Sequence, residues 1–294
     1  MVGVGFVNIR HFLCFFVSMC LCISTREESL QQLHQPHELL VLPERFLKIR
    51  DVMMHERADA QTLAKLIQTD VAISATMLKI ANSSAYNPYQ KPLSSLSKAI
   101  ARLGLATSAQ IAMSMSLYHG IRLPIALQHM RYFWAHSFAV SQICALMGSC
   151  LREDAPCHRH DLFMMGLLHD VGCLLMAIHL DPRYFERDVL EKHGAALCVL
   201  ERRMYGLDHA EVGAMLLKDW HCSDDFIQAV VHHHDDDSDS LSAHLCSHAD
   251  QWVHEYWPNV QSIEGVQELL VSVFTDGMRE WLGQSEILSP WVKV

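Results

Sequence analysis

The chain has 294 residues, which is long enough for one large domain or two small ones with a full hydrophobic core. Half of the residues are hydrophobic, 19% are charged, and Gly (13) and Pro (9) are few, which excludes disordered, collagen-like and low-complexity chains. The net charge of −10 argues against a broad nucleic-acid-binding surface. Of the 20 histidines, 15 lie between His129 and His254, which indicates metal binding or acid–base chemistry in the second half.

The ten cysteines contain no CxxC pair, and several fall within apolar helical patterns. We therefore expect reduced thiols and a cytoplasmic protein. Near the N-terminus, an apolar run over residues 12–23 has the length of a signal-peptide core but falls short of the ~20 residues of a membrane span. The run is either a dispensable extension or an N-terminal membrane anchor, and residues 1–36 are expected to lie outside the fold.

Helical periodicity continues almost without a break from Leu42, and strand-like alternation is hard to find. Asp59 and Asp70 are placed to cap two short helices in tandem. Ser95 then opens another helix, which is expected to stop at Gly104 with a left-handed cap. This pattern predicts a first half made of several short helices.

The second half, beyond a joint near Pro124, is expected to hold longer helices. Their expected ranges are 126–150, 161–180, 183–204, 208–220, 223–234, 241–256 and 262–282. We therefore predict an all-α fold with two helical lobes, 38–124 and 125–285. The sequence has no P-loop, dinucleotide fingerprint, nucleophile elbow or zincin motif, so the histidines are the expected source of any chemistry.

The most informative segment is GLLHDVG at 166–172, an apolar stretch that carries His169 next to Asp170. Adjacent imidazole and carboxylate groups can ligate one divalent ion or two, and a buried helix would not otherwise hold an uncompensated carboxylate. For this pair alone, a hydrogen-bonded pair in the core is an equally good interpretation. Other residues of the same types occur on separate amphipathic helices: His136, His209, His232, His233, His234 and Asp250.

Short motifs follow one another in a fixed order along both halves. In the first half they are Leu42-Pro43, Asp59, Leu63-Ala64, Ile67, Asp70, Leu78, Ala81-Asn82-Ser83, Ser95-Leu96, Ala99-Ile100 and Leu103-Gly104. In the second half they are Trp134, His136, Ser137, Gly166 to Gly172, Gly206, Asp208, His209 to Ala214, Leu216, Leu217 and Trp220. Together they resemble the HD superfamily of metal-dependent phosphohydrolases, and more closely its HDOD branch. The resemblance covers about residues 42–250 and implies a two-lobed helical fold in a bacterial signalling protein.

The resemblance also implies a site for a divalent metal, which would be Fe, Mn, Zn or Mg. The metal ligands common to the superfamily correspond to His136, His169, Asp170 and Asp250. The additional ligands of its two-metal members correspond to His209, His233 and His234, which leaves His232 as the spare member of the triplet. Four other histidines match no motif and are expected at the surface or behind the ligands: His221, His244, His248 and His254.

Two departures from the related HD-GYP phosphodiesterases bear on function. Those enzymes have a lysine where this chain has Cys173, and a neutral thiol cannot replace a cation that faces a phosphate. Their DGxGYP segment is also missing, because His234 is followed by DDDSDSLSAH. The departures favour a regulatory or scaffold module without phosphodiesterase activity, although one able to bind metal. The alternative is a metal-dependent phosphohydrolase.

The expected partner is a signalling protein or a small ligand in the cleft between the two lobes. No nucleic acid is expected, in keeping with the negative net charge. Contact with a membrane is expected only through residues 12–23, if this run is an anchor.

Overall fold

The computed structural model describes residues 25–33, 42–54, 59–89, 91–121, 123–157, 161–186, 194–235, 237–256 and 266. Every regular element in these ranges is a helix and none is a β-strand, which confirms the predicted all-α class. In chain order the helices are α2 (Arg26–Leu33), α3 (Glu44–Met54), α4 (Ala60–Ile67), α5 (Val71–Asn82), α6 (Leu96–Leu103), α7 (Leu105–Gly120), α8 (Leu127–Cys150), α9 (Leu162–Leu168), α10 (Val171–His179), the 3-10 turn η1 (Tyr184–Glu186), α11 (Ala195–Tyr205), α12 (His209–Asp219), α13 (Asp224–Val231) and α14 (Leu241–Tyr256).

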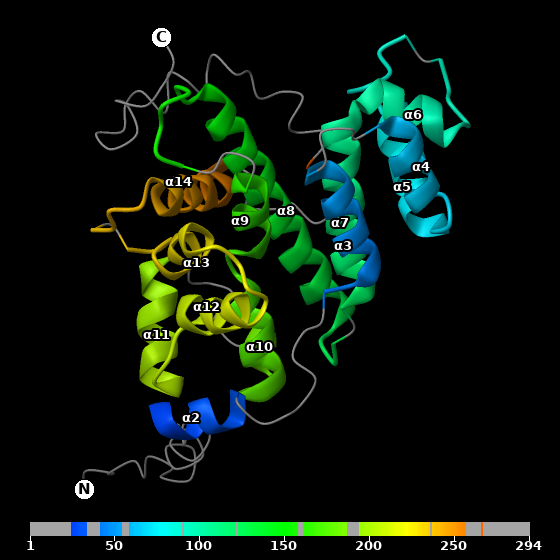
Figure 1. The fold of residues 1–294 in the computed structure, drawn as a ribbon. Coiled ribbons are helices and arrows are strands. Elements are labelled where there is room, and N and C mark those ends of the chain that lie inside the picture. Colours follow the sequence, from blue (N-terminus) through cyan, green and yellow to red (C-terminus); the bar gives the residue numbers. More distant parts are fainter. Residues whose placement is uncertain are drawn as a thin grey trace, which may run out of the picture.

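Helices α3 to α7 gather on one side of the molecule and α9 to α14 on the other, with the long helix α8 between them (Figure 1). Helix α7 packs on α3 and also contacts α8, so it joins the two groups. The predicted lobes, 38–124 and 125–285, each have one end outside the described residues. Their boundaries therefore stay predictions.

The start of each helix in the first group follows from local chemistry. Asp59 accepts hydrogen bonds from two backbone amides at 2.8 Å where α4 begins, and Asp70 does the same at 3.0 Å where α5 begins. Both predicted caps are confirmed, and Arg45 contacts Asp70 at 2.5 Å. Gly104 joins α6 to α7 with φ +86° and ψ 157°. The expected break is present, but its conformation is the extended one open almost only to glycine, and not the left-handed helical one.

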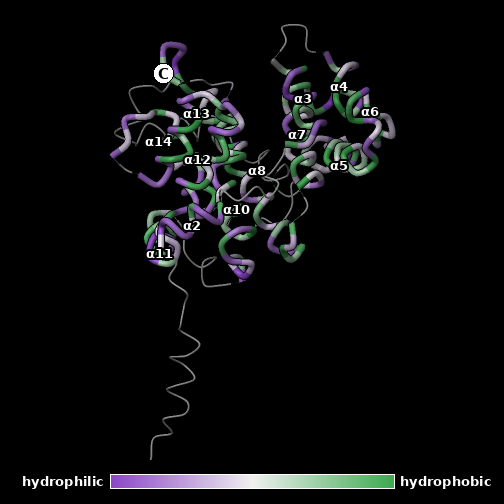
Figure 2. The backbone as a smooth tube through the Cα atoms, turned by 60° about the horizontal axis from the view of Figure 1, so that its bottom comes forward, coloured by the Kyte–Doolittle hydropathy of each residue, from purple (hydrophilic) through white to green (hydrophobic). Residues whose placement is uncertain are grey.

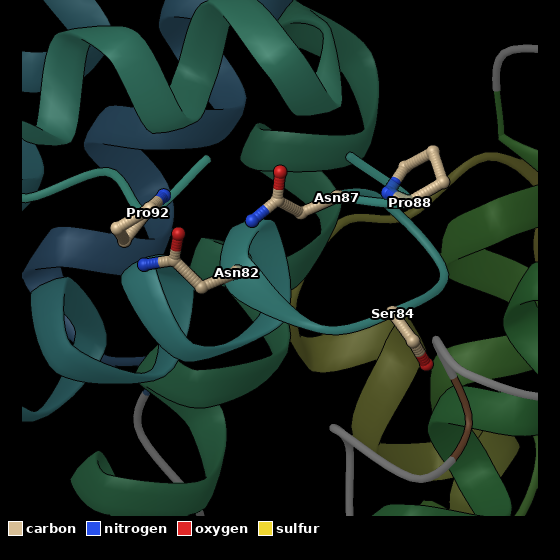
Figure 3. Close-up of a pocket in the computed structure, with 5 residues that line it drawn as sticks. All are labelled: Asn82, Ser84, Asn87, Pro88 and Pro92. Carbon is tan, nitrogen blue, oxygen red and sulfur yellow. The ribbon is translucent and has the colours of Figure 1, made fainter. Parts of the chain in front are cut away.

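The loop after α5 is held by two asparagine side chains. The Asn82 amide nitrogen donates to the carbonyl of Leu93 at 2.8 Å, and its oxygen accepts from the amide of the same residue at 2.7 Å. Asn87 accepts from the backbone amide of Lys91 at 3.0 Å. A hollow of about 410 Å³ lies beside these asparagines (Figure 3). Because the asparagines bond the backbone of their own loop, they explain the shape of the loop without a ligand.

Hydrophobic residues recur along the helices of both groups, with hydrophilic residues between them (Figure 2). The amphipathic helices turn their apolar faces inward and form one hydrophobic core. Large side chains of α8 lie fully within it, among them Trp134 and Phe138. Helix α8 is therefore the central support of the second group.

Two glycines of the GLLHDVG segment allow helices to approach closely. A Cβ added to Gly166 would lie 2.7 Å from the Cα of Ser141 on α8. A Cβ added to Gly172 would lie 1.9 Å from the carbonyl oxygen of His209 and 2.7 Å from the amide of Gly213, both on α12. Only a residue without a side chain fits at these crossings. The glycines therefore draw α8 and α12 toward the His–Asp pair that lies between them in sequence.

The helix expected over 161–180 is instead two helices, α9 and α10, interrupted at His169 and Asp170. The physical reason is packing, because α8 approaches closely at Gly166 before the corner and α12 approaches closely at Gly172 after it. Among the described residues, Leu162–His179 is the segment with the length and composition of a membrane span, and 78% of it is buried inside the fold. The segment is therefore part of the protein core.

Two other expected helices are also changed, and a third is not tested. The one over 183–204 is the turn η1 followed by α11, which begins after Gly194 with φ +59°. The one over 223–234 ends at Val231, so the histidine triplet lies in a turn. The one over 262–282 lies outside the described residues, apart from residue 266.

Helix α2 corrects the expectation that residues 1–36 lie outside the fold. Arg26 forms an ion pair with Glu211 at 2.9 Å, and the buried hydroxyl of Ser29 donates to the carbonyl of Tyr205 at 2.7 Å. Leu33 is also buried. These contacts attach residues 26–33 to α11 and α12. The apolar run over 12–23 lies outside the described residues, so the choice between extension and anchor stays open.

Candidate metal centre

Five segments, namely the central helix α8 and four parts of the second group, send side chains to one region of the core. The seven predicted ligands come from α8 (His136), the corner between α9 and α10 (His169, Asp170), the start of α12 (His209), the turn after α13 (His233, His234) and α14 (Asp250). Their donor atoms form overlapping groups within 4.8 Å, which share Asp170 and His136. The structure thus brings all seven together, while their role as ligands stays a prediction.

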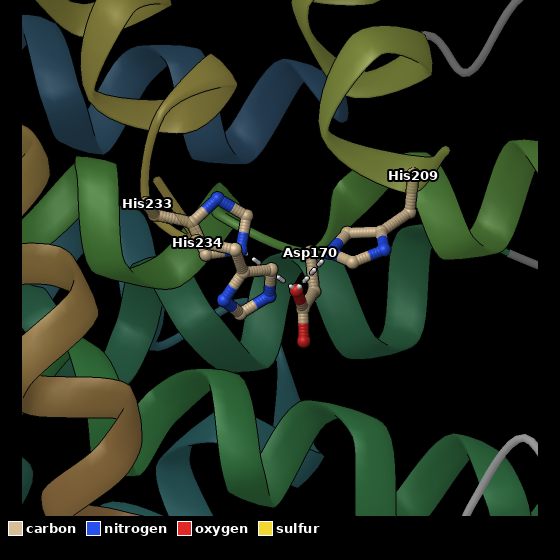
Figure 4. A group of neighbouring side chains, drawn as sticks. All are labelled: Asp170, His209, His233 and His234. Carbon is tan, nitrogen blue, oxygen red and sulfur yellow. Dashed lines mark ion pairs between the residues drawn. The ribbon is translucent and has the colours of Figure 1, made fainter. Parts of the chain in front are cut away.

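Asp170 lies at the centre of one group (Figure 4). Its carboxylate is 3.1 Å from Nε2 of His169, 3.3 Å from Nε2 of His209 and 3.4 Å from Nε2 of His233. The rings of His233 and His234 lie 3.8 Å apart, so both members of the pair face this side. His232 lies outside the group and contacts Asp235 at 3.2 Å.

Asp250 is the centre of a second group. Its Oδ1 is 3.0 Å from Nε2 of His136 and 3.7 Å from Nε2 of His169. His254, which was expected at the surface or behind the ligands, also reaches this oxygen, at 3.2 Å. Ligands about 2.0–2.2 Å from one shared ion lie about 2.9–3.5 Å apart at octahedral or tetrahedral angles. The short contacts of both carboxylates fall in this range.

The other nitrogen of three rings is held by hydrogen bonds. Nδ1 of His169 donates to the carbonyl of Gly166 at 2.9 Å, and Nδ1 of His233 donates to that of Val230 at 2.6 Å. Nδ1 of His209 donates to Glu201 at 2.7 Å. With the proton assigned to Nδ1, each ring points the lone pair of Nε2 at Asp170, as in metal-binding histidines.

Several buried atoms of the centre form ion-pair contacts of 3.0–3.4 Å that lack the geometry of a hydrogen bond: Nε2 of His136, His169, His209 and His233, and Oδ1 of Asp250. Buried polar atoms nearly always have a partner, so five such atoms in one place call for an explanation. A divalent cation would satisfy nitrogen lone pairs and carboxylate oxygens at once. The residues present therefore fit a metal ion of the kind that the superfamily binds.

Electrostatics favour the metal-binding form of both carboxylates and of His234, but not of His169, where Asp170 outweighs burial and raises the pKa of the imidazole well above its usual value. Burial alone would raise the pKa of Asp170, but the neighbouring imidazoles of His169, His209 and His233 outweigh it and lower that pKa well below its usual value. Asp250 behaves in the same way beside its own histidines. Burial lowers the pKa of His234 to about 2, and His233 and His209 act in the same direction. The site thus combines two anionic carboxylates with a neutral imidazole at His234.

Behind His209 lies a buried group that was not predicted from the sequence. Glu201 of α11 accepts from both Nδ1 and the backbone amide of His209, the latter at 3.0 Å. The hydroxyl of Tyr184 donates to Glu201 and lies 3.4 Å from the sulfur of Cys173. Glu201 stands in the charged stretch Glu201-Arg202-Arg203, which looks solvent-facing, so no local pattern distinguishes it. His254 did carry a signal, since it lies four residues after Asp250 on one helical face.

Comparison with known proteins agrees with this architecture. The HDOD domain family model matches residues 39–236. An HDOD domain protein of unknown function from Geobacter sulfurreducens has a similar structure, with 22% identity, a TM-score of 0.62 and coverage of 93% of this chain and 94% of that one. A candidate signal transduction protein from Marinobacter aquaeolei VT8 has 18% identity and a TM-score of 0.61, with coverage of 93% and 67%.

A candidate phosphohydrolase from Shewanella amazonensis SB2B is also similar, with 21% identity, a TM-score of 0.58 and coverage of 88% of this chain and 94% of that one. At these identities the structures show a common fold. An uncharacterised protein from Treponema pallidum (strain Nichols) is 24% identical over 200 residues, which are 66% of this chain and 37% of that protein. The family match extends over well more than half of the sequence. The chain belongs to the HDOD domain family.

Proposed function

We propose that this chain is a regulatory or scaffold module of bacterial signal transduction, which holds a divalent metal but does not hydrolyse phosphodiesters. The observation that carries the proposal is the environment of Cys173. Its side chain is buried beside Tyr184 and in one group with Glu201 and His209, and burial raises the pKa of the thiol well above its usual value. A neutral thiol turned into the core offers no positive charge to a phosphate.

The carboxylates of the centre support the same conclusion. Among the described residues, the ion pairs of Asp170 and Asp250 are all with histidines, and none is with lysine or arginine. Charge that develops on a phosphate must be met by positioned cations or donors, and loss of one such group typically costs about 10²–10³ in rate. The metal alone would have to supply this stabilisation.

The alternative is a metal-dependent phosphohydrolase. The full set of seven ligand-type side chains in one place favours it. When bound, a divalent ion would supply Lewis acidity and an activated water for attack on a phosphate ester. A phosphohydrolase would also need a segment that binds the substrate and a cation that faces the phosphate. Cys173 does not supply this cation.

A cavity of about 610 Å³ between the two helix groups supports a small ligand as the regulatory partner. Apolar side chains from both groups line it, including Phe46 and Met113 on one side and Phe163 and Phe226 on the other. Arg50, Gln110 and Asp161 add polar groups at its wall. The volume lies within the about 300–1,000 Å³ typical of small-molecule sites. We therefore propose a ligand with an apolar body and one polar group, in preference to a protein partner.

The cavity and the metal centre share helix α9. Phe163 and Leu168 of α9 line the cavity, and His169 follows directly in sequence. A ligand that shifts α9 therefore also shifts a predicted metal ligand. This connection is a physical route by which the cavity and the centre can influence each other.

We also propose a cytoplasmic location, because the buried cysteines Cys144, Cys173 and Cys246 are thiols outside any disulfide. Cys144 and Cys246 are the best example, since their sulfurs lie only 3.9 Å apart in the core and share a hydrogen bond but no disulfide. Such thiols are typical of reducing compartments.

The test is metal analysis of the full chain purified without chelators, together with hydrolysis assays after loading with Mn²⁺ or Fe²⁺. The substrates are cyclic di-GMP and bis(p-nitrophenyl) phosphate, and Asp170→Ala is the reference. We expect metal in the wild type and no turnover above that of Asp170→Ala. Metal-dependent turnover that disappears in Asp170→Ala would instead place the chain among the phosphohydrolases.

A further inference from the structure

We infer that His254 is an additional ligand of the metal at the Asp250 end of the centre, and that it closes this end to water. The inference rests on the proposed function and gives it a structural cause. Nε2 of His254 and Nε2 of His136 approach the same oxygen of Asp250, at 3.2 and 3.0 Å. The donor atoms of these three residues all lie within 4.8 Å of one another.

Helix geometry explains why His254 reaches the site. Residues four apart lie on one face of a helix, one turn from each other, so Asp250 and His254 project together from α14. Helix α14 packs on α8, which carries His136. The rings of His136 and His254 lie 4.6 Å apart as a result.

His254 also occupies the outer side of the centre. Its side chain is 21% exposed and that of Asp170 is 20% exposed, whereas those of His136 and Asp250 are 8% and 6% exposed and that of His169 is fully buried. A side chain in this position lies between the buried ligands and the solvent. It is therefore placed where a water molecule would otherwise reach the ion.

The number of protein ligands around a metal ion determines whether a position stays open for water. Catalytic metal sites keep one position open for water or substrate, whereas structural sites fill their positions with protein ligands. His136, His169, Asp170 and Asp250 are the four ligands that the resemblance implies, and His254 adds a fifth donor. A nitrogen-rich set also favours a transition ion such as Zn²⁺ or Fe²⁺ over Mg²⁺.

The competing role for His254 is a hydrogen bond that only positions Asp250. Metal affinity does not separate the two roles, because loss of a hydrogen-bonding partner of a ligand also costs about 10–100-fold in affinity. The count of coordinated rings and the access of water to the ion do separate them. His254→Gln keeps a hydrogen-bond donor but removes the imidazole, and His248→Ala makes a matched change on the same helix.

The experiment uses the full chain loaded with Co²⁺ for proton NMR and with Mn²⁺ for water relaxivity. We expect His254→Ala and His254→Gln each to lose one paramagnetically shifted imidazole N–H signal relative to the wild type. We also expect His254→Ala to gain relaxivity, because water enters the vacated position. His248→Ala should match the wild type in both measurements.

Unchanged signals and relaxivity in His254→Ala would overturn the inference, as would wild-type behaviour of His254→Gln or a wild-type chain that takes up neither ion. The two results on the His254 variants leave the proposed function standing, whereas a wild type that takes up neither ion would contradict both. Hydrolysis of phosphodiesters by the wild type would contradict the module, whereas an inactive wild type with unchanged His254 variants would contradict only this ligand assignment.

Discussion

Polar side chains are used differently in the two helix groups. In the first group, Asn82, Asn87 and Asp70 give their oxygens to backbone amides, so each holds a loop or a helix end. In the second group, the histidines around Asp170 use one nitrogen in the same way but leave the other buried without a hydrogen bond. Polar groups that hydrogen-bond to the backbone stabilise the fold. Buried polar groups that lack such a hydrogen bond indicate a ligand.

The largest effect is expected for Asp170→Ala. This carboxylate forms ion pairs with four of the predicted imidazole ligands, so its loss removes a partner that all four share. We expect metal affinity to fall by more than the about 100-fold that marks loss of a supporting residue. Metal content after dialysis measures the effect, and metal content equal to that of the wild type would contradict the shared role of Asp170.

Metal removal should destabilise the second group. A ligand at 100 times its Kd stabilises the folded state by about 2.7 kcal/mol. In a domain of this size, each kcal/mol shifts Tm by about 2–4 °C, so chelation should lower the Tm by about 5–10 °C. Thermal unfolding with and without EDTA measures this shift. Asp170→Ala is the control, because its Tm should not respond to the chelator.

Glu201→Gln sharpens the comparison, because it alters a residue that touches His209 and no other predicted ligand in the hydrogen bonds of the site. Removing the negative charge weakens the hold on Nδ1 of His209 and makes Nε2 a poorer donor to metal. We expect metal affinity to fall by about 10–100-fold, with the helical content unchanged. A competitive titration with a metal indicator measures the metal affinity. An unchanged affinity would show that Glu201 does not support metal binding by His209.

The smallest effect is expected for Asp70→Ala in the first group. The substitution removes the cap of α5 and the contact with Arg45. Loss of a cap typically costs about 1 kcal/mol of stability. Chemical denaturation measures this cost, and metal content should stay at the wild-type value. Loss of metal in this variant would show that the two groups do not use their polar residues independently.

Much of the fold could be predicted from the sequence, because local signals set it. The caps at Asp59 and Asp70 and the long helix α8 depend on nearby residues, and the structure agrees with them. The break at His169 was not predictable from periodicity, since apolar residues continue on both sides of it. It depends on packing against α8 and α12, which only the folded chain provides.

The candidate site also has a part that could be predicted from the sequence and a part that depends on tertiary packing. The seven predicted ligands were found through their order along the chain, which the resemblance to a known family supplied. Glu201 and helix α2 were missed because their partners, His209 and Tyr205, are set by tertiary packing and leave no local pattern. The cavity between the helix groups was expected as a cleft, but its lining residues come from distant segments.

Anomalous diffraction from crystals of the full chain, collected at the absorption edge of the bound metal, tests the central claim most directly. The claim is that the side chains around Asp170 form a divalent-metal centre. We expect an anomalous peak about 2.0–2.2 Å from a carboxylate oxygen of Asp170 and from Nε2 atoms of the histidines around it. A metal-loaded crystal with no peak beside Asp170, or with its peak away from the seven predicted ligands, would contradict the account.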